Sequence, residues 1–186
     1  TNVPEEMKIP TNWPEPMRIE YGEDEGLKSA GEHRERLVNG FRKIRTAIND
    51  FNPDIVLIWG DDQYENFRED CLPPFCVLAR DHIESRPFHR GALGAPPTPN
   101  VWGEDPDTLF VHRGDKPLAM HLTNELCERG FPVAASLINS HHADEGPTAL
   151  THAFLNALLY LDWDRRGFDY PIVPVQVNAY GKQVVP

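Results

Sequence analysis

The chain has 186 residues, of which 40% are hydrophobic and 25% charged, a balance typical of a globular domain with enough material for a core. Its 29 acidic and 18 basic residues give a net charge of −11, which argues against a nucleic-acid partner. No apolar run reaches the roughly 20 residues of a membrane helix, and no signal peptide is visible at the start. Three cysteines without a CxxC pair indicate reduced thiols. We therefore expect a cytoplasmic protein with neither nucleic acid nor membrane as its partner.

The N-terminal segment is predicted to be irregular, and the first clear helix follows it. Residues 1–25 contain four prolines, and we expect Trp13 and Met17 to anchor this segment. Residues 31–50 are predicted to be helical because apolar residues recur at helical spacing, and we expect their charged face to be solvated. These apolar residues are Leu37, Phe41, Ile44 and Ile48.

The stretch from Asn52 to Phe67 organises the rest of the chain. Residues 55–59 form an unbroken apolar run, which predicts a strand buried on both faces. Polar residues follow abruptly, and we call the segment Asp61–Glu65 the first tip. In α/β proteins the carboxyl end of a buried strand is a usual place for ligands.

Strands and helices alternate in the remaining sequence. We predict strands over residues 75–79, 132–138 and 170–178, the last at an edge or a bulge because it contains Pro174. Helices are predicted from a cap at Asp115 to about residue 129, and over residues 147–161. The long connection 81–112 is functional or contains further elements. The pattern predicts an α/β fold, with a largely parallel or mixed central sheet and helices on both faces.

A second polar segment, Asn139–Gly146, follows the strand over residues 132–138, and we call it the second tip. If both strands run in parallel, the two tips face one crevice, where histidines and carboxylates can bind a divalent metal or act as acid and base. The residues concerned are Asp61, Asp62, Gln63 and Glu65 in the first tip and His141, His142, Asp144 and Glu145 in the second, with His152 two turns into the next helix. Capping of that helix is the alternative role of Asp144 or Glu145.

Several stretches of the sequence resemble the class III extradiol ring-cleaving dioxygenases, the superfamily of the protocatechuate 4,5-dioxygenase catalytic subunit. Pro53-Asp54, Asp62 and Phe67 match its Pro-Asp, Asn-Asp-His and Phe positions, and Leu72–Phe75 is similar to its Ile-Pro-Thr-Phe. Asp144–Leu150 is similar to its Asp-His-Gly-x-Thr-x-Pro-Leu, and Ile172–Asn178 to its Val-Ile-Pro-x-x-Val-Asn strand. The matches keep the family's order over about residues 50–180.

This resemblance implies a ferrous iron site of two histidines and one carboxylate, which binds a catecholic substrate and O2. The sequence departs from it at two positions: Gln63 stands at a histidine ligand, and Glu145 at an active-site histidine. On this basis we expect three groups of site residues: Gln63, Glu65 and Asp62 near the metal, His142 and Glu145 in catalysis, and His141 and Tyr64 at the substrate. We also expect Asp62 to hold the tip by hydrogen bonds, and packing is the simpler role for Tyr64.

The family's N-terminal Ser-His segment and its C-terminal half are not in this chain, so we expect one domain, residues 1–186, that is an incomplete part of a longer catalytic domain. The function predicted is an iron-dependent extradiol-type dioxygenase, associated as a homo-oligomer or with a small partner subunit. Two alternatives stay open: a binding or regulatory member whose metal site has decayed, and a hydrolase or lyase that uses another divalent metal.

Overall fold

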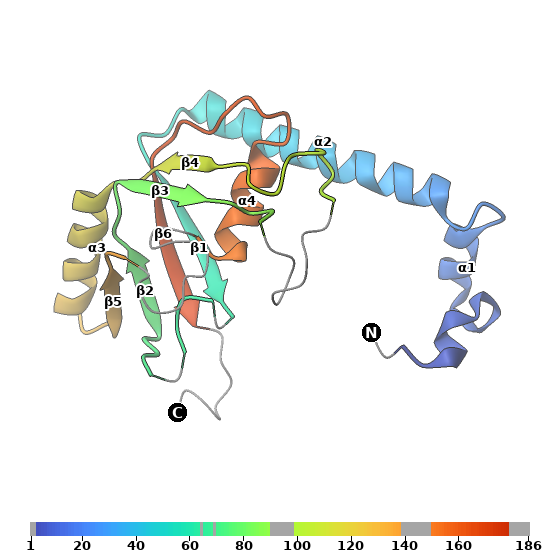
Figure 1. Cartoon of the computed structure of the whole chain (residues 1–186), viewed down its shortest axis with the longest axis horizontal. Helices are drawn as coiled ribbons and strands as arrows, with labels where there is room; N and C mark the ends of the chain where they lie inside the picture. The colour runs from blue at the N-terminus through green and yellow to red at the C-terminus, as the bar shows by residue number, and fades with distance from the viewer. Residues whose placement is uncertain (1–2, 64, 69, 90–98, 139–149, 179–186) are drawn as a thin grey trace. The chain divides into compact units, whose positions relative to one another are not determined.

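The computed structural model describes residues 3–63, 65–68, 70–89, 99–138 and 150–178, and the chain forms two units, Thr1–Ala47 and Ile48–Pro186 (Figure 1). In the first unit the segment predicted to be irregular contains short helices: the 3-10 helices η1 (Glu5–Lys8) and η2 (Pro10–Asn12), and α1 (Glu15–Tyr21). Trp13 anchors them as predicted, because its ring packs edge-on against Tyr21 and its Nε1 donates to the Met7 carbonyl at 2.6 Å. Met17 does not, since its side chain is exposed.

The first predicted helix is confirmed as α2 (Leu27–Phe51), which is longer than expected at its N-terminal end. Asp24 explains this start, because its carboxylate accepts hydrogen bonds from the backbone N–H groups of Gly26 and Lys28. Within the described part of the chain, no helix combines the length and the apolar character needed to cross a bilayer.

The second unit is built on a four-stranded sheet with the order β1-β6-β2-β5. Its strands are β1 (Val56–Asp62), β2 (Phe75–Leu78), β5 (Val133–Ser136) and β6 (Ile172–Asn178). β1 pairs in parallel with β6, and β2 with β5, but β2 and β6 are antiparallel. The sheet is therefore mixed, which confirms the predicted fold class.

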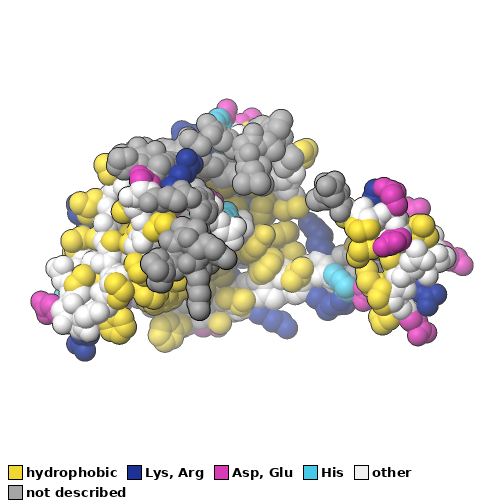
Figure 2. Space-filling view, turned by 90° about the horizontal axis from the view of Figure 1, so that it is seen from below, with side chains coloured by type: hydrophobic (Ala, Val, Ile, Leu, Met, Phe, Trp, Pro, Cys, Tyr) yellow, Lys and Arg dark blue, Asp and Glu magenta, His cyan; other side chains and the backbone are white. Residues whose placement is uncertain are grey.

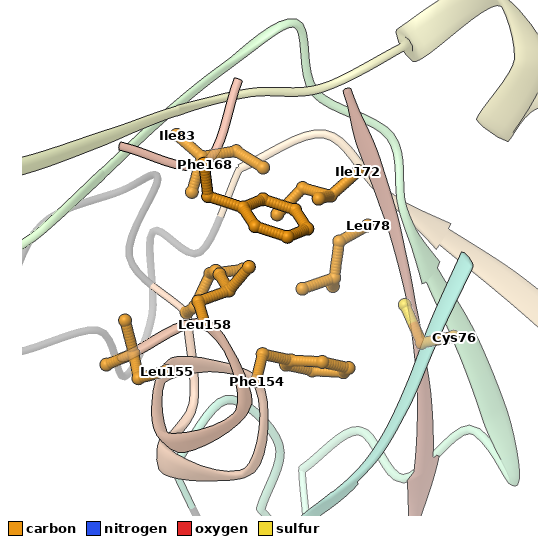
Figure 3. Packing of buried hydrophobic residues seen from close by; sticks show 9 residues of the cluster. Cys76, Leu78, Ile83, Phe154, Leu155, Leu158, Phe168 and Ile172 are labelled. Atoms are coloured by element: carbon orange, nitrogen blue, oxygen red, sulfur yellow. The ribbon is translucent and has the colours of Figure 1, made fainter. Parts of the chain in front are cut away.

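Helices cover both faces of the sheet. On one face, Phe154 and Leu158 of α4 (His152–Leu161) pack against Leu78 and Ile172, as Figure 3 shows. On the other face, α3 (Lys116–Glu128) packs through Ala119 against alternate residues of the central strands, Val77, Val173 and Val175. The alternation of side chains along β2 and β6 thus supplies both halves of the core.

Two predictions about the strands are wrong. β1 is not buried on both faces, because it is an edge strand on which Leu57 and Trp59 are exposed. α4 covers only the face that carries Val56 and Ile58. Conversely, β6 is a central strand despite Pro174, which lies one residue outside the ladder with β2, whose last pair is Val77–Val175. The missing N–H of the proline therefore interrupts no pair of that ladder.

The long connection 81–112 contains two strands that the sequence did not reveal, β3 (His82–Ser85) and β4 (Phe110–Arg113), which form an antiparallel hairpin. The segment before β4 is held by Arg165, whose guanidinium lies 3.8 Å from the centre of the Trp102 ring and pairs with both carboxylate oxygens of Glu104. Residues 102–104 are thus tied to Arg165, which follows α4 in the sequence.

Capping signals in the sequence predict where the two helices that cover the sheet begin and end. α3 begins as predicted, because the carboxylate of Asp115 accepts the N–H of Leu118 at 2.9 Å, and Gly130 follows its end at a positive φ of 83°. α4 begins later than predicted, at His152, with Leu150 and Thr151 still outside the helix. His152 is therefore the first residue of this helix and does not lie two turns into it.

Candidate functional site

Asp62 forms the end of β1 and fixes the turn that follows. Its side chain is fully buried, and its two carboxylate oxygens accept the backbone N–H groups of Asn66 at 2.9 Å and Phe67 at 3.1 Å. Asp62 thus makes the hydrogen bonds expected of it. A carboxylate that receives two N–H groups stabilises a tight turn, because it satisfies donors that the strand can no longer pair.

Glu65 connects this turn to the start of α4. One carboxylate oxygen accepts the backbone N–H of His152 at 3.1 Å, and the other lies 2.8 Å from Nδ1 of the same residue. Glu65 therefore occupies the place of a helix cap, where a negative charge also favours the N-terminal end of the helix dipole. Thr151, the residue before the helix, makes no capping bond and instead donates through its hydroxyl to the Asp61 carbonyl at 3.4 Å.

Amide side chains at the end of β6 lie next to this turn. The Asn66 amide donates to Oε1 of Gln176 at 2.9 Å, and Gln176 is almost completely buried in β6. Asn178 is the register partner of Asp62 and donates through its side chain to the Pro73 carbonyl. Among the described residues no acceptor lies within hydrogen-bonding distance of the Gln176 Nε2.

Gln63 and Glu65 bond to different partners. Gln63 is exposed, and its amide donates to the carboxylate of Asp61 at 2.8 Å. Strand alternation puts Asp61 on the face of Leu57 and Trp59, opposite the face that α4 covers. The predicted ligands Gln63 and Glu65 are thus engaged in two separate interactions.

The described residues do not by themselves fit an iron site. Within residues 3–63, 65–68, 70–89, 99–138 and 150–178, no three histidine, cysteine or acidic side chains lie close enough to hold one ion. Asp62 is buried and receives two N–H groups, and Glu65 is paired with His152. Metal binding by Asp62, Gln63 and Glu65 therefore stays a prediction.

The rest of the predicted site lies outside the described residues. This applies to Tyr64 and to the catalytic and substrate-binding candidates of the second tip, His141, His142, Asp144 and Glu145. The strands that carry the tips are described, and they correct one expectation. β1 is parallel to β6, β6 is antiparallel to β2, and β2 is parallel to β5. β1 and β5 therefore end at opposite edges of the sheet, and their carboxyl ends do not face one crevice.

The contacts of Glu65 with His152 and of Asn66 with Gln176 were not predicted. Their partners lie 87 and 110 residues apart in sequence, so only the fold brings them together. One signal was available for Gln176, which interrupts an otherwise apolar strand. A polar side chain at such a position needs a partner.

Comparison with known proteins gives the chain a context. No family model matches it. It is 29% identical over 136 residues to a protein of Comamonas testosteroni, which covers 73% of this chain and 33% of that relative. It is 27% identical over 146 residues to a protein of Rhodococcus jostii (strain RHA1), and 24% identical over 148 residues to one of Rhodococcus rhodochrous; each covers 78% of this chain and, respectively, 37% and 42% of the relative.

All three relatives carry the name 2,3-dihydroxyphenylpropionate/2,3-dihydroxicinnamic acid 1,2-dioxygenase. In that reaction the bond between ring carbons 1 and 2 lies next to the 2,3-diol, so the cleavage is extradiol. This chain is similar to extradiol-type ring-cleaving dioxygenases. The similarity confirms the resemblance seen in the sequence, and the chain spans between a third and a little over two fifths of the length of these relatives.

Proposed function

We propose that this chain is part of an extradiol-type dioxygenase that opens a catecholic ring with O2. The observation that supports it is similarity over about three quarters of the chain to relatives named for this reaction. The substrate class would be an aromatic acid with two adjacent hydroxyl groups, as in the names of those relatives. In the reaction one ring bond breaks next to the diol and both atoms of O2 enter the product.

The cofactor proposed is non-haem Fe²⁺, which would bind the diol and O2 when present. The residues proposed near it are Gln63, Glu65 and Asp62; those proposed for catalysis are His142 and Glu145, and those for substrate contact His141 and Tyr64. The protein is also proposed to be cytoplasmic and to act as a homo-oligomer or with a small partner subunit. The geometry of the first tip adds one restriction. Because Asp62 is buried and holds the turn, its contribution would be to position the tip.

The experiment is metal analysis of the anaerobically purified full-length protein, together with oxygen uptake on 2,3-dihydroxyphenylpropionate. Phenylpropionate without hydroxyl groups is the control substrate. Near-stoichiometric iron and uptake only with the diol are expected, with a product that contains both oxygen atoms. Folded protein that holds no iron and consumes no oxygen would refute the proposal.

Single substitutions test the residues. Glu65→Ala is expected to lower iron content and uptake, whereas Glu128→Ala, which removes an exposed carboxylate from α3, should change neither. If Gln63→Ala and Glu65→Ala both leave iron and uptake unchanged, the first tip has no part in the site. Unaltered turnover in His142→Ala and Glu145→Ala would likewise remove the second tip from the mechanism.

A second function, a binding protein whose metal site has decayed, is favoured by one observation. Gln63, an exposed amide that donates to the Asp61 carboxylate, stands at the position of a histidine ligand in the family that the sequence resembles. This alternative predicts that the diol binds, as measured by calorimetry, without oxygen uptake and without a metal requirement. A dependence on zinc or manganese would point instead to a hydrolase or lyase.

A further inference from the structure

The first unit carries an apolar stripe along α2. Ala30, Leu37 and Ile44 follow one another at intervals of seven residues, which places them on one side of the helix. All three are exposed, Leu37 to 61% and Ile44 to 54%. A helix in water gains most of its stability from packing of an amphipathic face, so this stripe is a surface suited to a partner.

The segment before α2 carries exposed apolar side chains of its own. We call residues 3–25 the N-terminal arm, and on it Met7, Ile9, Met17 and Ile19 are exposed, the last to 72%. The contacts of Trp13 with Tyr21 and with the Met7 carbonyl fold the arm on itself. These side chains are therefore presented on a small ordered body, which lowers the conformational cost of binding.

The arm and α2 have opposite charges. The arm has seven acidic and two basic side chains, a net charge of −5, whereas α2 has six basic and three acidic side chains, a net charge of +3. Arg36 and Lys43 directly precede the stripe residues Leu37 and Ile44. In Figure 2 hydrophobic and acidic side chains gather on the arm, and Lys and Arg side chains lie along the helix. Charge complementarity of this kind favours association and sets its orientation.

Within one copy, the described contacts tie the arm to the beginning of α2. Asp24 bonds to the N–H of Lys28, and Glu20 lies 3.9 Å from His33. Ile44 lies 11 residues beyond His33, about 16 Å along the helix axis. The exposed side chains of the arm can therefore bind the α2 helix of a second copy. In the same way, the exposed stripe of α2 can bind the arm of that copy.

We propose that two copies of this chain associate by arm exchange, in which the N-terminal arm of each copy binds the stripe of α2 of the other. The contact is reciprocal, so a twofold axis closes the dimer and leaves neither stripe open. Apolar side chains of the arm cover Leu37 and Ile44, and its carboxylates meet Arg36 and Lys43. This surface is independent of the proposed ring cleavage, and its test does not use activity.

Sedimentation equilibrium of the whole chain measures the association. The wild type is expected to be a dimer that weakens as salt is raised, because salt screens the charges. Leu37→Glu with Ile44→Glu is expected to weaken dimerisation at least about tenfold, as for central interface residues. The matched control, Asn39→Glu with Thr46→Glu, adds the same charge to the same helix two positions further on, away from the stripe, and should remain dimeric. Circular dichroism checks that both variants keep their helix.

Charge reversal distinguishes arm exchange from direct pairing of two α2 helices. Arg36→Glu with Lys43→Glu and, in a second variant, Glu6→Lys with Glu23→Lys should each weaken the dimer, and a chain with all four changes should regain it. Pairing of α2 with α2 would leave the dimerisation of the arm variant unchanged, and this result would overturn the proposal. A wild type that stays monomeric at every concentration also overturns it.

Discussion

The contact between Gly60 of β1 and α4 provides a sharp test of the packing behind the first tip. A Cβ atom at Gly60 would lie 2.8 Å from the Phe154 ring and 3.1 Å from the Cβ of Ala153. Phe154 is fully buried, so its ring has little room to move. Overpacking of this kind costs about 1–3 kcal/mol, and the lower chain entropy of alanine offsets up to about 1 kcal/mol of it. Gly60→Ala should therefore lower the free energy of unfolding by about 1–2 kcal/mol.

Urea unfolding measures this effect as a midpoint lower by about 0.5–1 M, at a slope of about 2 kcal/mol per M. The control is Gly31→Ala in α2, where no atom lies within 4 Å of the new methyl group. There the same change should stabilise the helix by about 1 kcal/mol. Phe154→Leu should reduce the cost of Gly60→Ala in a double-mutant cycle. If Gly60→Ala unfolds at the wild-type midpoint, α4 does not lie against β1 as described.

Three further predictions concern buried polar groups. Asp62→Asn should cost about 1–3 kcal/mol in urea unfolding, because an amide offers one acceptor oxygen to two N–H groups; an unchanged midpoint would contradict the turn contacts. Burial lowers the pKa of His112 below 6.5, so the unfolded state binds more protons and stability is lost as the pH falls below about 6.5. His112→Gln should flatten this dependence, measured by urea unfolding at several pH values, and an equal slope in both proteins would refute it. Burial raises the pKa of Cys76 to about 12, so a thiol reagent at pH 8 should label the exposed Cys71 and Cys127 quickly and Cys76 only on unfolding.

Sequence reasoning succeeded where the signal was local. The cap at Asp115 and the stop at Gly130 bound α3 as predicted, because both depend on residues within one turn of the helix end. Strand direction is different in kind. The apolar runs of β1 and β5 look alike in sequence, yet the two strands run in opposite directions. β1 is parallel to β6, whereas β5 is parallel to β2, and β2 and β6 are antiparallel. Apolar runs also do not report exposure, as Trp59 on the edge strand shows.

The candidate site shows the same division. Asp62 bonds to N–H groups four and five residues away, so its role in the turn follows from short-range chemistry. Both Glu65 and His152 are candidates from the sequence, but their contact requires α4 to begin at His152. The sequence predicts a start at residue 147 instead, which puts His152 inside the helix. The sequence therefore identified the two residues that make the contact but misplaced the helix end that brings them together.

The contacts of the first tip also rank its three proposed metal residues. An oxygen atom that binds an ion must give up or share its present hydrogen-bond partner. Gln63 would bind through its amide oxygen, whereas its bond to Asp61 is donated by the amide nitrogen, so that bond need not be lost. Glu65 would have to share or release an exposed pair with His152, worth up to about 1 kcal/mol, and one backbone N–H. Asp62 would have to expose a buried carboxylate and release two N–H groups of the turn. A metal at this tip would therefore recruit Gln63 and Glu65 first, and it would depend on Asp62 for the turn that presents them.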